Sequence, residues 1–128
     1  DVRRSRGGPA VRYALLIYAD DSAWVDLPDE EKAALRSDEM PEWVALFGEL
    51  GKADPDVSGH ELDGRRTARV VKVRDGERIV TDGPYAETKE IVGGVFVIEL
   101  PDLDEAIRIA SLIPTAKQGS IEIRSILQ

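Results

Sequence analysis

The sequence contains no cysteine, and it has one histidine and one methionine among its 128 residues. The absence of cysteine excludes disulfide bonds, a thiolate nucleophile, and zinc or iron–sulfur sites with cysteine ligands. The single histidine, His60, excludes any site that needs two imidazoles from one chain. No apolar run approaches the roughly 18 residues that span a bilayer, and no secretory signal is visible. We therefore expect a cytoplasmic protein without a membrane partner.

Negative charge dominates the composition, because 25 acidic residues oppose 17 basic ones and the net charge is −8. This balance argues against nucleic acid as a partner, since nucleic-acid binding requires a basic face. Residues 1–10 differ, since three arginines there oppose one aspartate. Such a segment suits phosphate contacts, but the Gly-Gly-Pro sequence after it is typical of a flexible leader. We expect a flexible basic N-terminal arm over residues 1–10 and a single domain over residues 11–128.

Local patterns predict strands and helices in a definite order. Pro28 and the acids after it mark a helix start, and Pro41 favours a break between two helices. Asp75-Gly76 predicts a tight hairpin turn, and Gly93-Gly94 predicts a bulge or a close backbone approach. The expected strands cover 13–18, 57–62, 67–73, 78–81, 92–100 and 121–126, and the expected helices cover 28–37, 41–51 and 102–113.

The helical patterns also predict which side chains are buried. The second helix carries one apolar stripe at helical spacing, made of Trp43, Leu46, Phe47 and Leu50. The last helix opens with a capping-box-like pattern at Asp102. Its expected buried face consists of Leu103, Ala106, Ile107 and Ala110.

The order of elements predicts an α+β fold with the ferredoxin-like β-α-β-β-α-β arrangement. This arrangement gives an antiparallel sheet with its helices on one face. Residues 15–17 and 95–98 are apolar at positions of both parities, so the other face should also be covered. The simplest cover is a second copy of the sheet, packed face to face in a two-fold homodimer.

Residues 82–90, Asp-Gly-Pro-Tyr-Ala-Glu-Thr-Lys-Glu, form the segment richest in chemically useful groups. Asp-Gly-Pro predicts a specific turn, in which aspartate accepts local N–H bonds, glycine allows an unusual φ and proline fixes the chain. A phenol, an amine and carboxylates then follow at Tyr85, Lys89, Glu87 and Glu90. These groups suit the binding or protonation of a small polar molecule. On spacing alone, a structural turn followed by a solvated helical turn is the favoured interpretation.

This segment, with Gly93-Gly94 after it, resembles the signature of the DGPF branch of the YCII-related proteins. Tyr85 stands where the family motif has phenylalanine. Further matches lie in order around the motif and extend the resemblance over residues 11–128: 12–18, Trp43, Gly59, Leu62, 68–70, 102–106, 113–114 and 121–124.

The resemblance implies a ferredoxin-like fold that dimerises through its sheets as a dimeric α+β barrel, with one cleft per subunit between sheet and helices. It leaves the activity open. Some YCII-related proteins share a histidine and an aspartate in a proposed active site, and other dimeric α+β barrels are monooxygenases, isomerases, dehalogenating enzymes or haem enzymes. Some DGPF proteins are associated with sigma factors of transcription.

The position of the histidine departs from the family pattern. YCII-related proteins carry theirs on the first main helix, whereas residues 41–51 of this chain have none. His60 instead lies on or near the second strand, where it is either a surface residue or a base near neutral pH. A haem would need an axial ligand, and His60 is the one imidazole present. No P-loop or dinucleotide motif occurs, so we expect no cofactor and no metal.

Two functional hypotheses follow. In the first, the protein is a small-molecule binding protein or an enzyme, with Asp82 and His60 as candidate catalytic residues. Tyr85, Lys89 and Arg69 would then hold a polar or anionic ligand, and Trp43 and Tyr18 would form an apolar wall. Asp82 has an alternative role in orienting the turn, and Trp43 an alternative place in the core. In the second hypothesis, the protein is a non-catalytic regulatory or interaction module linked to sigma-factor-dependent transcription.

Overall fold

The computed structural model describes residues 10–85 and 88–127. Four strands form an antiparallel sheet in the order β2-β5-β1-β6, and two further strands pair as a separate hairpin. The elements are β1 (Val11–Ala19), α1 (Asp29–Ala53), β2 (Ser58–Glu61), β3 (Arg69–Arg74), β4 (Glu77–Asp82), β5 (Ile91–Leu100), α2 (Leu103–Ser111) and β6 (Ser120–Ser125). Without the hairpin, the order is β-α-β-β-α-β, which confirms the predicted ferredoxin-like α+β fold.

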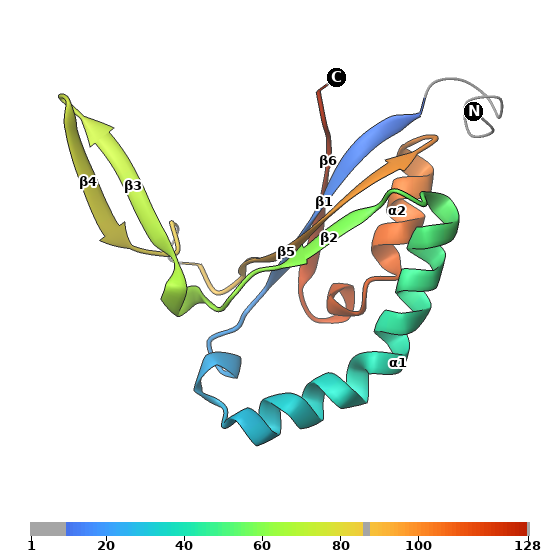
Figure 1. Ribbon diagram of the computed structural model, residues 1–128, viewed down its shortest axis with the longest axis horizontal. Coiled ribbons are helices and arrows are strands. Elements are labelled where there is room, and N and C mark those ends of the chain that lie inside the picture. The colour runs from blue at the N-terminus through green and yellow to red at the C-terminus, as the bar shows by residue number, and fades with distance from the viewer. Residues whose placement is uncertain (1–9, 86–87, 128) are drawn as a thin grey trace.

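Both helices cover the same face of the sheet (Figure 1). Side chains alternate between the two faces of a strand, so Tyr13, Leu15 and Ile17 of β1 all point toward the helices. They are buried with alternate residues of β5 and with residues of both helices, and the core cluster also contains Leu46, Leu50, Phe96, Ile98, Leu100, Ala106, Ile109 and Ile113. The intervening residues form the sheet's second face, which we call the open face: Ala14, Leu16, Val95 and Val97 are its partly exposed apolar members.

The predicted bulge at the paired glycines is confirmed. Ile17 pairs with Gly94 and Tyr18 pairs with Val92, so Gly93 is the extra residue on β5. A Cβ atom at Gly94 would lie 3.2 Å from the carbonyl oxygen of His60. The second glycine therefore permits the close approach of β2.

The helix break predicted at Pro41 does not occur. One helix, α1, runs through Pro41 from Asp29 to Ala53. Proline removes only one helical N–H, and the good helix formers on both sides of residue 41 carry the helix across it. Figure 1 shows that α1 changes direction along its length, as expected for a helix that contains an internal proline.

Two predicted buried faces were wrong in part. In α2, Ala106, Ile109 and Ala110 are buried, whereas Leu103 and Ile107 are 53% and 49% exposed. At about 100° per residue, Ile107 lies about 60° beyond the edge of that buried stripe, whereas Leu103 is about 20° from Ala110 but is the first residue of the helix. In α1, Leu46 and Leu50 are buried as predicted, but Phe47 is 51% exposed.

The hairpin was predicted correctly in its local structure. Asp75 and Gly76 have φ angles of 51° and 78°, as a type I′ turn requires. Its two strands form a sheet of their own, which stands out from the four-stranded sheet on the side away from the helices (Figure 1). We call this unit, residues 69–82, the projecting hairpin.

The predicted basic arm lies outside the described residues except for Ala10. Within the described part of the chain, no helix is long and apolar enough to cross a bilayer.

Candidate functional site

A surface groove of about 580 Å³ lies where the projecting hairpin meets the end of the four-stranded sheet. We call it the junction groove. Its sheet side comes from Tyr18 at the end of β1 and from Ile91 and Val92 at the start of β5. Its hairpin side comes from the base of β3, and the segment before β3 and the described residues from Pro84 to Glu90 contribute the remainder. The apolar lining residues are Leu62, Ala68, Val70, Pro84, Ile91 and Val92, and the polar ones include Arg65, Arg69, Tyr85, Thr88 and Glu90.

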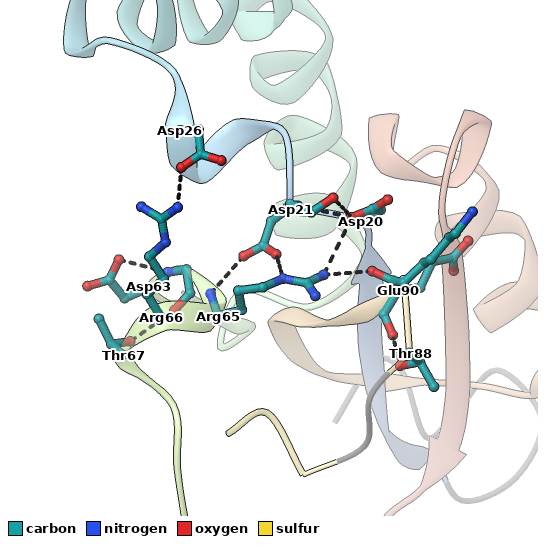
Figure 2. Close-up of polar contacts among 12 residues, drawn as sticks. Asp20, Asp21, Asp26, Asp63, Arg65, Arg66, Thr67, Thr88 and Glu90 are labelled. Carbon is teal, nitrogen blue, oxygen red and sulfur yellow. Dashed lines mark hydrogen bonds and ion pairs between the residues drawn. The ribbon is translucent and has the colours of Figure 1, made fainter. Parts of the chain in front are cut away.

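Arg65 holds three segments of this groove together (Figure 2). Its Nε donates to Asp21 Oδ1 at 2.5 Å, and its backbone N–H donates to Asp21 Oδ2 at 2.8 Å. The same guanidinium donates to the carbonyl oxygen of Lys89 at 2.8 Å. The end of β1, the turn at Arg65 and the segment before β5 are thus fixed by one side chain.

Sequence reasoning missed this network. Asp20-Asp21 follows β1 directly, where two acids are typical of the end of a buried strand. Arg65-Arg66 lies 44 residues further on, and Arg66 also binds an acid from this loop, Asp26. The signal in the sequence was the presence of two charged pairs, Asp20-Asp21 and Arg65-Arg66, but nothing local connects them.

Two groups at this end of the sheet have shifted pKa values. The Ser22 hydroxyl donates to Asp20 Oδ1 at 2.6 Å and lowers the pKa of that carboxyl, with a further contribution from the Ser22 backbone N–H. The Tyr18 hydroxyl donates to Glu122 Oε1 at 2.9 Å, and this hydrogen bond raises the pKa of Tyr18, as burial also does. Tyr18 is therefore held as a neutral phenol at the groove's edge.

Arg69 is a cation in the junction groove whose ion pair is weak. Its Nε lies 3.5 Å from Asp82 Oδ1, and both side chains are largely solvated, at 56% and 91% exposed. Its Nη1 donates to the carbonyl oxygens of Ala68 and Arg66, which holds the guanidinium in place. An exposed pair of this kind contributes about 0.2–1 kcal/mol, so a ligand anion can replace Asp82 at small cost.

The turn before β5 differs from its prediction in one respect. The only glycine of the described chain with a positive φ is Gly76, so Gly83 is not required for an unusual φ. A Cβ atom at Gly83 would lie 3.0 Å from the Ala68 Cβ, and Gly83 N–H donates to the Ala68 carbonyl oxygen at 2.9 Å. Glycine is needed because the turn packs closely on the base of β3. Ala86 and Glu87 of the motif lie outside the described residues.

The structure brings together three of the predicted ligand-binding residues. Tyr18, Arg69 and Tyr85 all line the junction groove. Tyr85 is 79% exposed, and Lys72 Nζ lies 5.5 Å from its ring centroid. Lys89 contributes its carbonyl oxygen to the Arg65 network, while its side chain lies outside the lining set.

The other predicted residues lie elsewhere. Trp43 lies on α1, packs against the core and contacts Phe47 with ring centroids 6.1 Å apart, so it does not share a wall with Tyr18. His60 is exposed on β2, paired with Val95, and so lies on the open face outside the groove lining. The Asp82 carboxylate is likewise not part of that lining. The geometry does not gather Asp82 and His60 into one acid–base pair.

Comparison with known proteins identifies the family of this chain. The model of the YCII-related domain family matches residues 11–128. An uncharacterised protein of Rhizobium meliloti is 36% identical over 117 residues, which cover 88% of this chain and 89% of that protein. A ferredoxin-like α+β protein of this kind belongs to a broad structural class. Within that class, this chain belongs to the YCII-related domain family.

Proposed function

We propose that the protein binds a small molecule with an apolar body and an anionic group in the junction groove. The observation that carries this proposal is the arrangement of Arg69 beside an apolar wall formed by Val70, Ile91 and Val92. A concave, mainly apolar surface with a few fixed polar groups is the usual form of a small-molecule site. Arg69 is the group that selects for an anion, since its guanidinium is always charged.

The rest of the lining favours binding over acid–base chemistry. The candidate acid and base, Asp82 and His60, both lie outside the lining. Tyr18, which is in the lining, has a raised pKa and remains protonated near neutral pH. Its phenol is committed as a donor to Glu122 and presents an oxygen acceptor toward a ligand. We assign no catalytic step to these residues.

The proposal is tested in two stages. Native mass spectrometry of the untreated protein would identify a molecule retained from the cell. Titration with anilinonaphthalene sulfonate, a fluorescent probe that combines an apolar body with an anion, then measures binding directly. We expect Arg69→Gln to weaken probe binding at least tenfold, which corresponds to about 1.4 kcal/mol.

A matched control is available in the neighbouring Arg66, an exposed arginine that pairs with Asp26 and lies outside the groove lining. Arg66→Gln removes the same charge and should change probe affinity less than twofold. Equal affinity of the Arg69→Gln protein and the wild type would refute the proposed site. Equal losses in both variants would show a general charge effect instead.

We also propose a homodimer formed through the open face of the sheet. Leu16, Val95 and Val97 are neighbours across β1 and β5 on this face and are only partly buried within one chain. A sheet with one uncovered apolar face is stabilised by a second layer about 10 Å away. Sedimentation velocity on the purified protein tests this directly, and a monomer at 100 µM would contradict it.

A regulatory or interaction module linked to sigma-factor-dependent transcription is the second candidate function. The observation that favours an interaction role is the projecting hairpin, which exposes Val71, Val73 and Val80. The two candidates differ in which surface matters, the junction groove or the hairpin. The Arg69 variant therefore separates them, because only the groove function depends on Arg69.

A further inference from the structure

One face of the projecting hairpin carries three exposed valines, flanked by Arg69, Asp82 and Arg78. Val71 and Val80 pair across the two strands, and Val73 follows two residues along β3, so the three valines share a face. They are 60%, 54% and 61% exposed. We call this surface the valine face. It begins at the Arg69–Asp82 pair, so it is continuous with the junction groove, which Arg69 lines.

A hairpin of this kind is poorly stabilised by its own chain. A single two-stranded hairpin is marginal in water, and it usually needs a third strand or a packed layer. In the part of the chain that the structure describes, β3 and β4 pair only with each other. Exposed valines on such a unit are therefore best explained by a covering partner.

Charge indicates what that partner is. Residues 69–82 contain four basic and three acidic residues, a net charge of +1, so the other 114 residues carry −9. Arg78, which shares the valine face, forms no ion pair with any described residue, and neither do Lys72 and Arg74 on the opposite face. A basic hairpin is attracted to the acidic body of a second copy of this chain, and two hairpins repel each other.

The area available for contact also supports a second copy of this chain as the partner. Four strands about 4.8 Å apart and averaging about seven residues give the open face a footprint of roughly 450 Å². A stable interface buries about 600–1,000 Å² on each partner. The valine face, with two six-residue strands, adds roughly 200 Å² and brings the sum to the lower end of that range.

We infer that the valine face docks on the body of a second copy in the homodimer, so that the partner closes the junction groove at Arg69. The inference rests on the proposed homodimer and on the groove as a ligand site. A ligand in the closed groove contacts both copies, so ligand binding and dimerisation strengthen each other. By thermodynamic linkage, the two effects are equal: the ligand tightens the dimer by the same factor by which dimerisation tightens ligand binding.

The dimer contact is tested by sedimentation velocity on the full chain. In the triple variant Val71→Thr, Val73→Thr, Val80→Thr, each residue keeps its shape and β-branching, so the hairpin should persist. We expect its dimer dissociation constant to rise at least tenfold. Ile79→Thr, on the opposite face of the same hairpin, is the matched control and should change it less than threefold.

A sheet variant separates this inference from the proposed homodimer. Val95→Thr, Val97→Thr makes the same chemical change on the open face. If the sheet variant weakens the dimer and the valine variant does not, the sheet dimer stands and the docking of the hairpin is refuted. If both weaken it, both are supported. A wild-type protein that is monomeric at 100 µM refutes both.

The coupling to the groove is tested with anilinonaphthalene sulfonate. Its dissociation constant should fall about tenfold as the protein concentration rises through the dimer dissociation constant, and saturating probe should tighten the dimer by the same factor. The valine variant should lose this dependence and bind like the wild-type monomer. Probe binding that is tight and independent of protein concentration would refute the shared groove while leaving the groove itself as a ligand site.

Discussion

The Arg65–Asp21 pair is expected to hold the junction groove in shape. Arg65→Met keeps the length and volume of the side chain and removes its charge. Asp21→Asn keeps one oxygen for the Arg65 backbone N–H, but its amide NH2 cannot accept from Arg65 Nε, so the substitution removes the charge and that side-chain hydrogen bond. The two single variants and the double variant form a cycle that isolates the interaction between the two side chains.

The magnitude follows from the burial of the pair. The Arg65 and Asp21 side chains are 23% and 19% exposed, so the pair is partly buried. A fully solvated ion pair contributes about 0.2–1 kcal/mol, and a charge-assisted hydrogen bond about 1.5–3 kcal/mol. The contribution of this pair should lie between the two. We expect a coupling of about 1.5 kcal/mol. Arg65→Met also loses the hydrogen bond to the Lys89 carbonyl oxygen, so its total cost should be about 2–3 kcal/mol.

Urea unfolding followed by circular dichroism gives the four free energies of unfolding. Hydrogen exchange at residues 88–91 adds a local measurement, because the segment before β5 loses its tie to Arg65. Exchange there should accelerate in Arg65→Met more than in Asp21→Asn, which leaves the Lys89 contact in place. A coupling below about 0.3 kcal/mol, within the range of simple additivity, would refute the role assigned to the pair.

Three further predictions concern single sites. Asp54 is buried and accepts the backbone N–H groups of residues 56 and 99, so Asp54→Asn should destabilise the protein by about 2 kcal/mol, and an unchanged urea midpoint would contradict this. Gly59→Ala places a Cβ 2.5 Å from the Phe96 ring and should lower the free energy of unfolding by about 1–3 kcal/mol. Adding Phe96→Leu makes room for the new Cβ and should recover part of this loss. A double variant no more stable than Gly59→Ala would argue against that clash. Tyr18 has a raised pKa because it donates to Glu122, so an ultraviolet titration should show one tyrosine ionising above 10.0 in the wild type and nearer 10.0 in Glu122→Gln. Because folding favours the neutral phenol, its contribution to stability is complete below the unfolded-state pKa of about 10 and is lost as pH rises through the folded-state pKa. Glu122→Gln should reduce this loss of stability at high pH.

Local sequence determined most of the secondary structure. Short apolar runs predicted β1 and β5, alternation predicted β6, Asp75-Gly76 predicted the type I′ turn, and the paired glycines predicted the bulge in β5. Each of these features depends on residues within a few positions of one another, where backbone geometry and side-chain periodicity act directly. The break expected at Pro41 failed because the propensity of the flanking residues outweighs one missing N–H.

The site required the tertiary structure. Asp21 and Arg65 are 44 residues apart, and only the strand order brings them together. Tyr18 and Trp43 both look like aromatic wall residues in the sequence, yet they lie on opposite sides of the sheet, because one belongs to the open face and the other packs on the core. The sequence by itself determined the strands, the turns and the family. Contacts between distant segments decided which polar groups meet. They also decided that the hairpin stands apart from the sheet and forms the junction groove. No local sequence pattern records such contacts.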